Sequence, residues 1–159
     1  MDNALKKTVL RMFTYGLYAV AAKHGDEMSA MTVNWINQCS FDPPMLMLAV
    51  ESDSHSRQVI EASGAFAVNI YETDQRELAG KLGMTTAKHP EKVEGLTWNS
   101  GPATGSPLLD SALGWVECKV VNTLPAGDHT LFLAEVVEVG LNREGVPLTL
   151  KETGFKYAG

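Results

Sequence analysis

The stretch from Met28 to Leu48 constrains the fold of this 159-residue chain more than any other segment. It begins as an apolar, strand-like run, breaks at Asp42-Pro43-Pro44, and enters a second, fully apolar strand. The first run also carries amides and hydroxyls: Thr32, Asn34, Asn37, Gln38 and Ser40. A buried strand holds that many polar groups only where they find hydrogen-bond partners. The segment therefore indicates a polar ligand, such as a heteroaromatic one, or a half-exposed edge strand.

Two faces of this segment compete for the core. At a strand period of two, one face carries Thr32, Asn34, Ile36 and Gln38. The other face carries Met31, Val33, Trp35, Asn37 and Cys39. The spacing alone does not choose between them.

Hydrophobic patterning predicts six or seven strands with two or three short helices. The expected strands cover residues 14–23, 29–38, 45–51, 65–71, 112–123 and 129–140, with a short one within 147–159. The expected helices cover 2–11, 56–63 and 74–83, and residues 84–106 are expected to form a long loop. Long, regularly spaced strands joined by hairpins predict a mainly β fold, a closed or nearly closed barrel, in one domain over residues 1–159.

Composition limits which binding partners and which cellular compartment are expected. A net charge of −6 argues against nucleic acid and acidic membranes, because phosphate binding needs a basic face. Cys39 and Cys118 are interpreted as reduced thiols in a cytoplasmic protein, and no apolar run is long enough to cross a bilayer. Residues 12–22 follow basic residues as in a signal peptide, but the polar residues among them and Asp2 favour a mature cytosolic N-terminus.

Each candidate site residue also has an ordinary structural explanation. Ser52, Ser54, Ser56 and Arg57 open a helix and suit an anion, but they equally suit a plain helix cap. His129 follows a Gly-Asp hairpin turn and is either a strand residue or a group that reaches a ligand. Lys88 and Lys92 belong to the long loop, where solvated charge is the simpler interpretation. The histidines and cysteines show no metal-ligand spacing, so no metal is expected.

Several segments resemble, in their order and spacing, the flavin reductase-like family with the FMN-binding split-barrel fold, of the kind found in flavoredoxin and in reductase domains fused to rubredoxin. The matching pieces are residues 15–20, 30–35, 38–44, 54–56, 63–69, 105–109, 127–132 and 154–157. The resemblance implies a six-stranded antiparallel split β-barrel that works as a homodimer with flavin at the subunit boundary. Two departures are Ser54-His55-Ser56, where the family commonly has Ser-x-Thr, and Lys92-Val93, where it often has Lys-Phe.

The resemblance also implies which residues bind the cofactor. The isoalloxazine and ribityl chain would be lined by Ala30, Met31, Thr32, Val33, Asn34, Trp35, Gln38, Cys39 and Ser40. The FMN phosphate would be held by Ser54, Ser56 and Arg57, with Lys88 or Lys92 near the phosphate or the flavin edge. His129 would lie near the ring face, where a nicotinamide can stack, and is the candidate catalytic residue. The implied cofactor is FMN rather than FAD, with NAD(P)H as electron donor.

Three functions stay open at this point. The first is an NAD(P)H-dependent flavin reductase that passes hydride or electrons to free flavin, ferric iron or a redox partner. The second is an FMN-containing electron-transfer protein reduced by another protein. The third is a flavin-binding module without enzymatic activity.

Overall fold

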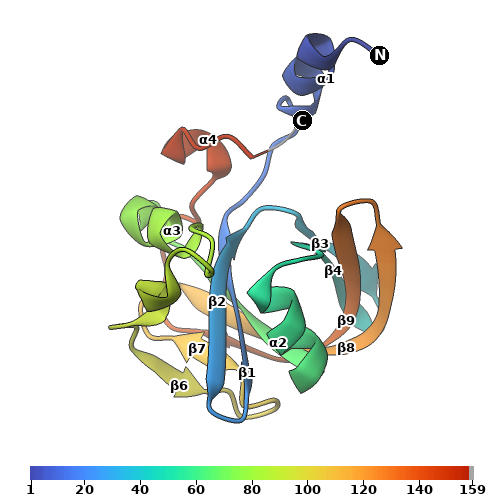
Figure 1. The fold of residues 1–159 in the computed structure, drawn as a ribbon. Helices are drawn as coiled ribbons and strands as arrows, with labels where there is room; N and C mark the ends of the chain where they lie inside the picture. Colours follow the sequence, from blue (N-terminus) through green and yellow to red (C-terminus); the bar gives the residue numbers. More distant parts are fainter. Residues whose placement is uncertain (158–159) are drawn as a thin grey trace.

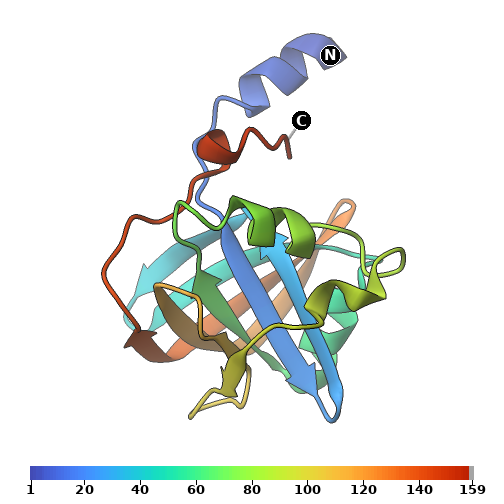
Figure 2. The ribbon, with the colours of Figure 1, turned by 90° about the vertical axis from the view of Figure 1, so that its left-hand side faces the viewer.

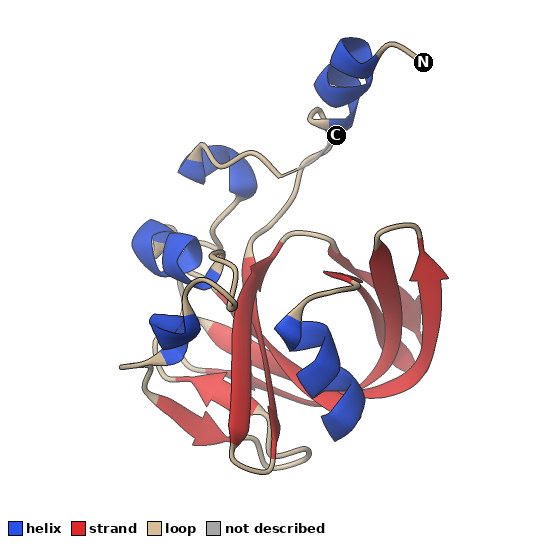
Figure 3. Ribbon diagram, in the orientation of Figure 1, coloured by secondary structure: helices blue, strands red, loops and turns tan. Residues whose placement is uncertain are grey.

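A curled antiparallel sheet forms the body of the molecule (Figures 1 and 3), in a computed structural model that describes residues 1–157. The strand order in this seven-stranded sheet is β2-β1-β5-β8-β9-β4-β3. The strands are β1 (Tyr18–His24), β2 (Glu27–Val33), β3 (Ile36–Phe41), β4 (Pro44–Glu51), β5 (Ala65–Ile70), β8 (Gly114–Ala126) and β9 (His129–Leu141). Two shorter strands, β6 (Trp98–Ser100) and β7 (Pro107–Leu109), form a separate sheet. The predicted mainly β class is confirmed.

The seventh strand arises because one predicted strand is divided in two. Residues 29–38 were expected to run continuously, but the chain leaves the sheet at Asn34 and Trp35. On one side β2 pairs with β1, and on the other β3 pairs with β4. The chain changes partner strands at this break, which a local hydrophobic pattern does not reveal.

The sheet buries apolar residues on both of its faces near β1. Val20 and Ala22 face the barrel interior, where α2 (His55–Ser63) contributes Val59 and Ile60. Ala19 and Ala21 belong to a second cluster, which also takes residues from β2, α3 (Arg76–Leu82), β7 and the segments around Tyr71 and Leu148. In Figure 2, α3 lies across the outer side of β1 and β2. The two clusters explain why β1 reads as apolar on both faces.

The remaining helices are short and lie outside the sheet. They are α1 (Asn3–Leu10), the 3₁₀ helix η1 (Pro90–Val93) and α4 (Leu150–Thr153). Helix α1 buries no residue and projects away from the barrel in both views (Figures 1 and 2). Helix α1 lies within the helix predicted over residues 2–11, whereas η1 and β6 both lie within residues 84–106, which were expected to form a loop. The strand predicted within residues 147–159 is wrong over the described residues. There the chain makes two isolated bridges, Gly16 to Thr149 and Glu72 to Pro147, and then forms α4. Over residues 1–157, no helix is both long enough and apolar enough to cross a bilayer.

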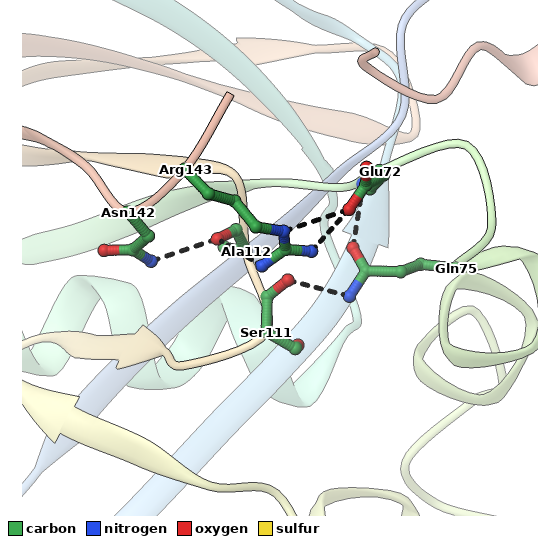
Figure 4. Close-up of polar contacts among 6 residues, drawn as sticks. All are labelled: Glu72, Gln75, Ser111, Ala112, Asn142 and Arg143. Atoms are coloured by element: carbon green, nitrogen blue, oxygen red, sulfur yellow. Dashed lines mark hydrogen bonds and ion pairs between the residues drawn. The ribbon is translucent and has the colours of Figure 1, made fainter. Parts of the chain in front are cut away.

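A polar clamp directs the C-terminal segment back over the barrel (Figure 4). Arg143 Nη2 and Nε donate to Glu72 Oε2 over 2.6 and 3.0 Å, and its Nη1 donates to the carbonyl of Ala112 over 3.3 Å. Gln75 joins the same clamp, because its Oε1 accepts from the Glu72 amide and its Nε2 donates to the Ser111 carbonyl. Beyond the clamp, Leu148 bonds the backbone of both Leu17 and Tyr71. Tyr157 is thereby brought beside Asn34, just after β2, and Glu51 at the end of β4.

Candidate functional site

A cavity of about 950 Å³ opens where β2, the end of β4, α2, α3 and the C-terminal segment meet. This volume falls within the range of sites for cofactor-sized ligands. The wall residues are Leu17, Met31, Thr32, Val33, Asn34, Trp35, Ala49, Val50, Glu51, Asp53, Ser54, His55, Ser56, Gln58, Ala79, Gly80, Leu82, Gly83, Met84, Thr85, Thr86, Ala87, Lys88, Lys92, Leu150, Phe155, Lys156 and Tyr157. Nine of the predicted site residues are among them: Met31, Thr32, Val33, Asn34, Trp35, Ser54, Ser56, Lys88 and Lys92.

The polar groups of the divided strand are bonded mainly to the protein itself. Thr32 Oγ1 donates to the Ala79 carbonyl over 2.7 Å and lies 2.9 Å from the Tyr71 hydroxyl. Asn34 Nδ2 donates to the Tyr157 carbonyl over 3.1 Å. These bonds join the cavity wall to α3 and to the C-terminal segment. The amides and hydroxyls that suggested a ligand therefore serve, at least in part, to build the wall.

The start of α2 reaches the cavity through its two serines. Ser54 caps the helix by accepting from the Arg57 amide, and Ser56 Oγ lies 2.6 Å from Ser29 Oγ. The Arg57 guanidinium is directed elsewhere, because its Nη1 donates to both carboxylate oxygens of Glu61 over 2.7 and 2.8 Å. The segment is a helix cap whose two serines also line the cavity, whereas Arg57 does not line it.

Lys92 is a buried cation in the cavity wall. Its residue is 3% exposed, and its Nζ donates to the carbonyls of Leu82 and Met84 over 3.1 and 2.8 Å. Among residues 1–157, no carboxylate lies within ion-pairing distance of this ammonium. Burial lowers the pKa of Lys92, since the charged form is poorly solvated. A buried ammonium without a counter-charge is costly, so this position favours a bound anion or an electron-rich edge. Lys88 and Lys156 add two further cations to the same wall.

His129 lies behind the wall rather than on it. Its ring contacts the indole of Trp35, with centroids 4.8 Å apart, and Trp35 in turn contacts the Tyr157 ring at 5.3 Å. His129 Nδ1 is 2.6 Å from Asp128 Oδ1, and its Nε2 is 3.1 Å from the Tyr157 hydroxyl. Trp35 and Tyr157 therefore lie between His129 and the cavity, so the predicted direct contact of His129 with a ligand is not supported by its position.

Besides Arg57 and His129, four predicted residues lie outside the cavity wall. Ala30 is fully buried in the cluster that includes Ala79 and Leu82. The others sit on β3: Gln38 Nε2 donates to the Ser40 carbonyl, and Cys39 is exposed with its Sγ 3.6 Å from the Met45 carbonyl. The divided strand explains this placement, because β3 pairs with β4 and runs away from the cavity from Ile36 to Phe41.

Sequence reasoning missed the C-terminal and β4 contributions to the wall. Glu51, Asp53, Phe155, Lys156 and Tyr157 all line the cavity, yet none was a candidate. The resemblance to the flavin reductase-like family at residues 154–157 pointed to this segment but assigned no binding role to it. Within residues 1–157 no cluster of three or more His, Cys, Asp or Glu side chains is arranged to hold a metal ion.

Comparison with known proteins places the chain in a family. Residues 10–159 match the flavin reductase like domain. The chain is 31% identical over 156 residues to the reductase component of 4-hydroxyphenylacetate 3-monooxygenase from Thermus thermophilus, covering 98% of this chain and 96% of that one. It is 26% identical to the high molecular weight rubredoxin of Moorella thermoacetica, covering 88% of this chain but only 62% of that protein.

A solved structure shares the fold. The NADH:FAD oxidoreductase of Streptomyces globisporus superposes with a TM-score of 0.77 at 29% identity, covering 89% of this chain and 84% of that one. The family match spans nearly the whole chain, and its matched residues include every segment that builds the cavity. This chain belongs to the flavin reductase-like domain family.

Proposed function

We propose that this chain is an NAD(P)H-dependent flavin reductase that binds FMN in the cavity and passes hydride or electrons to free flavin, ferric iron or a redox partner. The observation that carries the proposal is Lys92, a buried ammonium without a carboxylate partner in the wall of a cavity of about 950 Å³. Family membership supports the same chemistry. The proposed enzyme is a single domain over residues 1–159 and works in the cytoplasm as a homodimer.

The described residues fit a flavin. The cavity is large enough for a fused ring system, and its wall combines apolar side chains with a few directed polar groups, as cofactor sites do. Trp35 and Met31 would pack against the rings, Lys92 would stabilise negative charge at their edge, and Ser54 and Ser56 would face the phosphate. Bound flavin supplies the hydride-accepting and electron-transferring chemistry, while the protein positions it and excludes water.

The residues outside the wall keep only an indirect role in this proposal. Gln38, Cys39 and Ser40 lie on β3, next to an outward face that leaves Phe41 91% exposed and Met47 38% exposed. A second copy covering this face would bring β3 into an intersubunit boundary, which is where the proposed homodimer would place flavin. Size-exclusion chromatography with light scattering tests the dimer, and a monomeric mass at micromolar concentration would contradict it.

The experiment that tests the function is optical. Purified protein is mixed with excess FMN or FAD and desalted, and its visible absorption spectrum is then followed during addition of NADH or NADPH. Retained flavin absorbance that bleaches with either nucleotide supports the reductase, and comparing the two flavins tests the preference for FMN. Flavin that is retained but never bleached by nucleotide would contradict it.

Replacing Lys92 tests directly whether this buried ammonium contributes to flavin binding. Lys92→Met keeps the aliphatic stem and removes the charge, and loss of one charged hydrogen bond costs about 1.5–3 kcal/mol, so flavin affinity should fall at least about tenfold. Lys81→Met is the matched control, because Lys81 donates to the Glu94 carbonyl outside the cavity wall. Equal flavin affinity in the two variants would remove Lys92 from the site.

The similarity to the Moorella rubredoxin supports a second candidate, an FMN-containing electron-transfer protein reduced by another protein. The two candidates differ in one measurement. An electron carrier holds flavin and is reduced rapidly by reduced rubredoxin but negligibly by NADH or NADPH, whereas a reductase turns over the nucleotide.

A further inference from the structure

A chain of four polar side chains begins behind the cavity wall and reaches the wall at Tyr157 and Glu51. It begins at Asp128 in the β8–β9 turn, passes through His129 and the Tyr157 hydroxyl, and ends at Glu51 on β4. The Tyr157 hydroxyl lies 3.1 Å from His129 Nε2 and 2.8 Å from Glu51 Oε1. Tyr157 therefore joins two groups that lie opposite one another on paired strands, since β4 and β9 align Glu51 with His129.

Counting protons along this chain fixes the state of the imidazole. A phenol has a single proton, and an ionised carboxylate can only accept, so the Tyr157 hydroxyl donates to Glu51. Its oxygen must then accept from His129, which places a proton on Nε2. The Asp128 carboxylate likewise only accepts, which places a proton on Nδ1.

The surroundings are consistent with this arrangement. Burial, and secondarily the hydrogen bond to Glu51, raise the pKa of Tyr157, so the phenol keeps its proton. The hydrogen bond from His129 lowers the pKa of Asp128, so that carboxyl stays ionised. The contact of 2.6 Å between Nδ1 and Oδ1 has the short length of a charge-assisted hydrogen bond. His129 is 8% exposed, and a carboxylate faces one of its ring nitrogens while a carboxylate-bound hydroxyl faces the other.

We propose that Tyr157 is a positioning residue that, together with Glu51, holds His129 as a doubly protonated, cationic ring behind the indole of Trp35. The proposal rests on the proposed reductase function. A cationic ring beside the indole places positive charge directly behind the wall that would receive an anionic nicotinamide dinucleotide. The same bonds fix Trp35 and Tyr157, which form that wall. The described groups that face the ring and bear charge or a titratable proton are Asp128, Glu51 and Tyr157.

Nitrogen NMR of the flavin-free protein tests the proton arrangement without any activity. If the hydrogen-bond directions are as argued, His129 should show two protonated ring nitrogens at pH 7.5. The signals are assigned by their loss in His129→Gln. Tyr157→Phe removes the acceptor of the Nε2 proton. Glu51→Leu removes the acceptor of the phenol proton, which is then free to be donated to Nε2. Each variant should therefore convert one ring nitrogen to the unprotonated type. Tyr15→Phe, which removes a hydroxyl outside the cavity wall, is the control and should leave the spectrum unchanged.

Either of two NMR results would overturn the assignment: a single protonated nitrogen in the unmodified protein, or two protonated nitrogens that persist in Tyr157→Phe. Circular dichroism of each variant verifies that it is folded.

Kinetics then test the role. In Tyr157→Phe the aromatic ring still packs on Trp35, so flavin affinity should stay within about twofold, while the KM for NADH or NADPH should rise about fivefold, equivalent to roughly 1 kcal/mol of lost electrostatic attraction. An unchanged KM would overturn the positioning role. A protein with the expected NMR spectrum that oxidises neither nucleotide would instead contradict the proposed function and leave the proton arrangement standing.

Discussion

The hydrogen bonds of Thr32 give a quantitative test of how the cavity wall is built. Thr32 Oγ1 gives its one proton to the Ala79 carbonyl, so the Tyr71 hydroxyl must donate to Thr32. Tyr71 is 1% exposed, and burial raises the pKa of its hydroxyl, which therefore keeps its proton and needs an acceptor. The Ala79 carbonyl has a second donor, because the Gly83 amide reaches it over 3.0 Å. The Tyr71 hydroxyl therefore needs Thr32 as its acceptor, whereas the Ala79 carbonyl keeps a donor without Thr32.

Thr32→Val should destabilise the protein mainly by stranding the Tyr71 hydroxyl. An unsatisfied buried hydroxyl costs about 1–3 kcal/mol, and the lost bond to Ala79 adds little because Gly83 still satisfies that carbonyl. For a domain of this length each kcal/mol lowers Tm by about 2–4 °C, so a fall of about 2–12 °C is expected. Tyr71→Phe should cost only about 0.5–1.5 kcal/mol, because Thr32 keeps its bond to Ala79.

The combined variant Thr32→Val/Tyr71→Phe separates this explanation from simple loss of packing. Because no hydroxyl remains without a partner, it should be more stable than Thr32→Val alone, with a coupling free energy of about 1–3 kcal/mol. Urea unfolding of all four proteins measures the cycle, with exposed Thr73→Val as a control expected within about 0.5 kcal/mol of the unmodified protein. A double variant no more stable than Thr32→Val would refute the reasoning.

Three further outcomes follow from buried titratable groups. Glu117 is 0% exposed and accepts hydrogen bonds from the backbone amides of residues 103 and 104. Glu117→Gln should lower the free energy of unfolding by about 2–4 kcal/mol, because the new side-chain amide group faces donors. Urea unfolding measures this, and the control Glu138→Gln, at an exposed position, should change the free energy of unfolding by under about 0.5 kcal/mol. A thiol reagent should modify Cys118 only after unfolding, because burial raises the pKa of Cys118 to about 12. Labelling of Cys118 in the native protein would contradict this. The pKa of Lys92 is lower in the folded protein than in the unfolded chain. Between the lowered pKa and the usual 10.5 the unfolded chain therefore binds more protons than the folded protein. The free energy of unfolding, relative to that of Lys92→Met, should rise as pH increases through this window. Parallel slopes of the two proteins at pH 7, 9 and 10 would show that Lys92 is not desolvated.

Local patterning predicted much of the fold correctly. Hydrophobic patterning in residues 112–123 and 129–140 predicted the two strands of the β8–β9 hairpin, and the helix predicted over residues 56–63 is α2, capped by Ser54. Gly64 has the left-handed φ of 66° that a C-terminal glycine adopts. These features depend on residues close together in the sequence. The apolar character of β1 on both faces was also visible, and two separate clusters account for it.

Local patterning thus accounts for the long strands of the main sheet, apart from the break in residues 29–38, and for helices α1, α2 and α3. It also singled out the serines and lysines that line the cavity. The tertiary structure decided where residues 29–38 divide, which excluded Gln38, Cys39 and Ser40 from the wall. It also decided that Tyr157 meets Glu51, 106 positions earlier in the chain. The physical reason is range: propensity and periodicity act over a few residues, whereas strand exchange and hydrogen bonding to the C-terminal segment depend on contacts between distant parts of the chain.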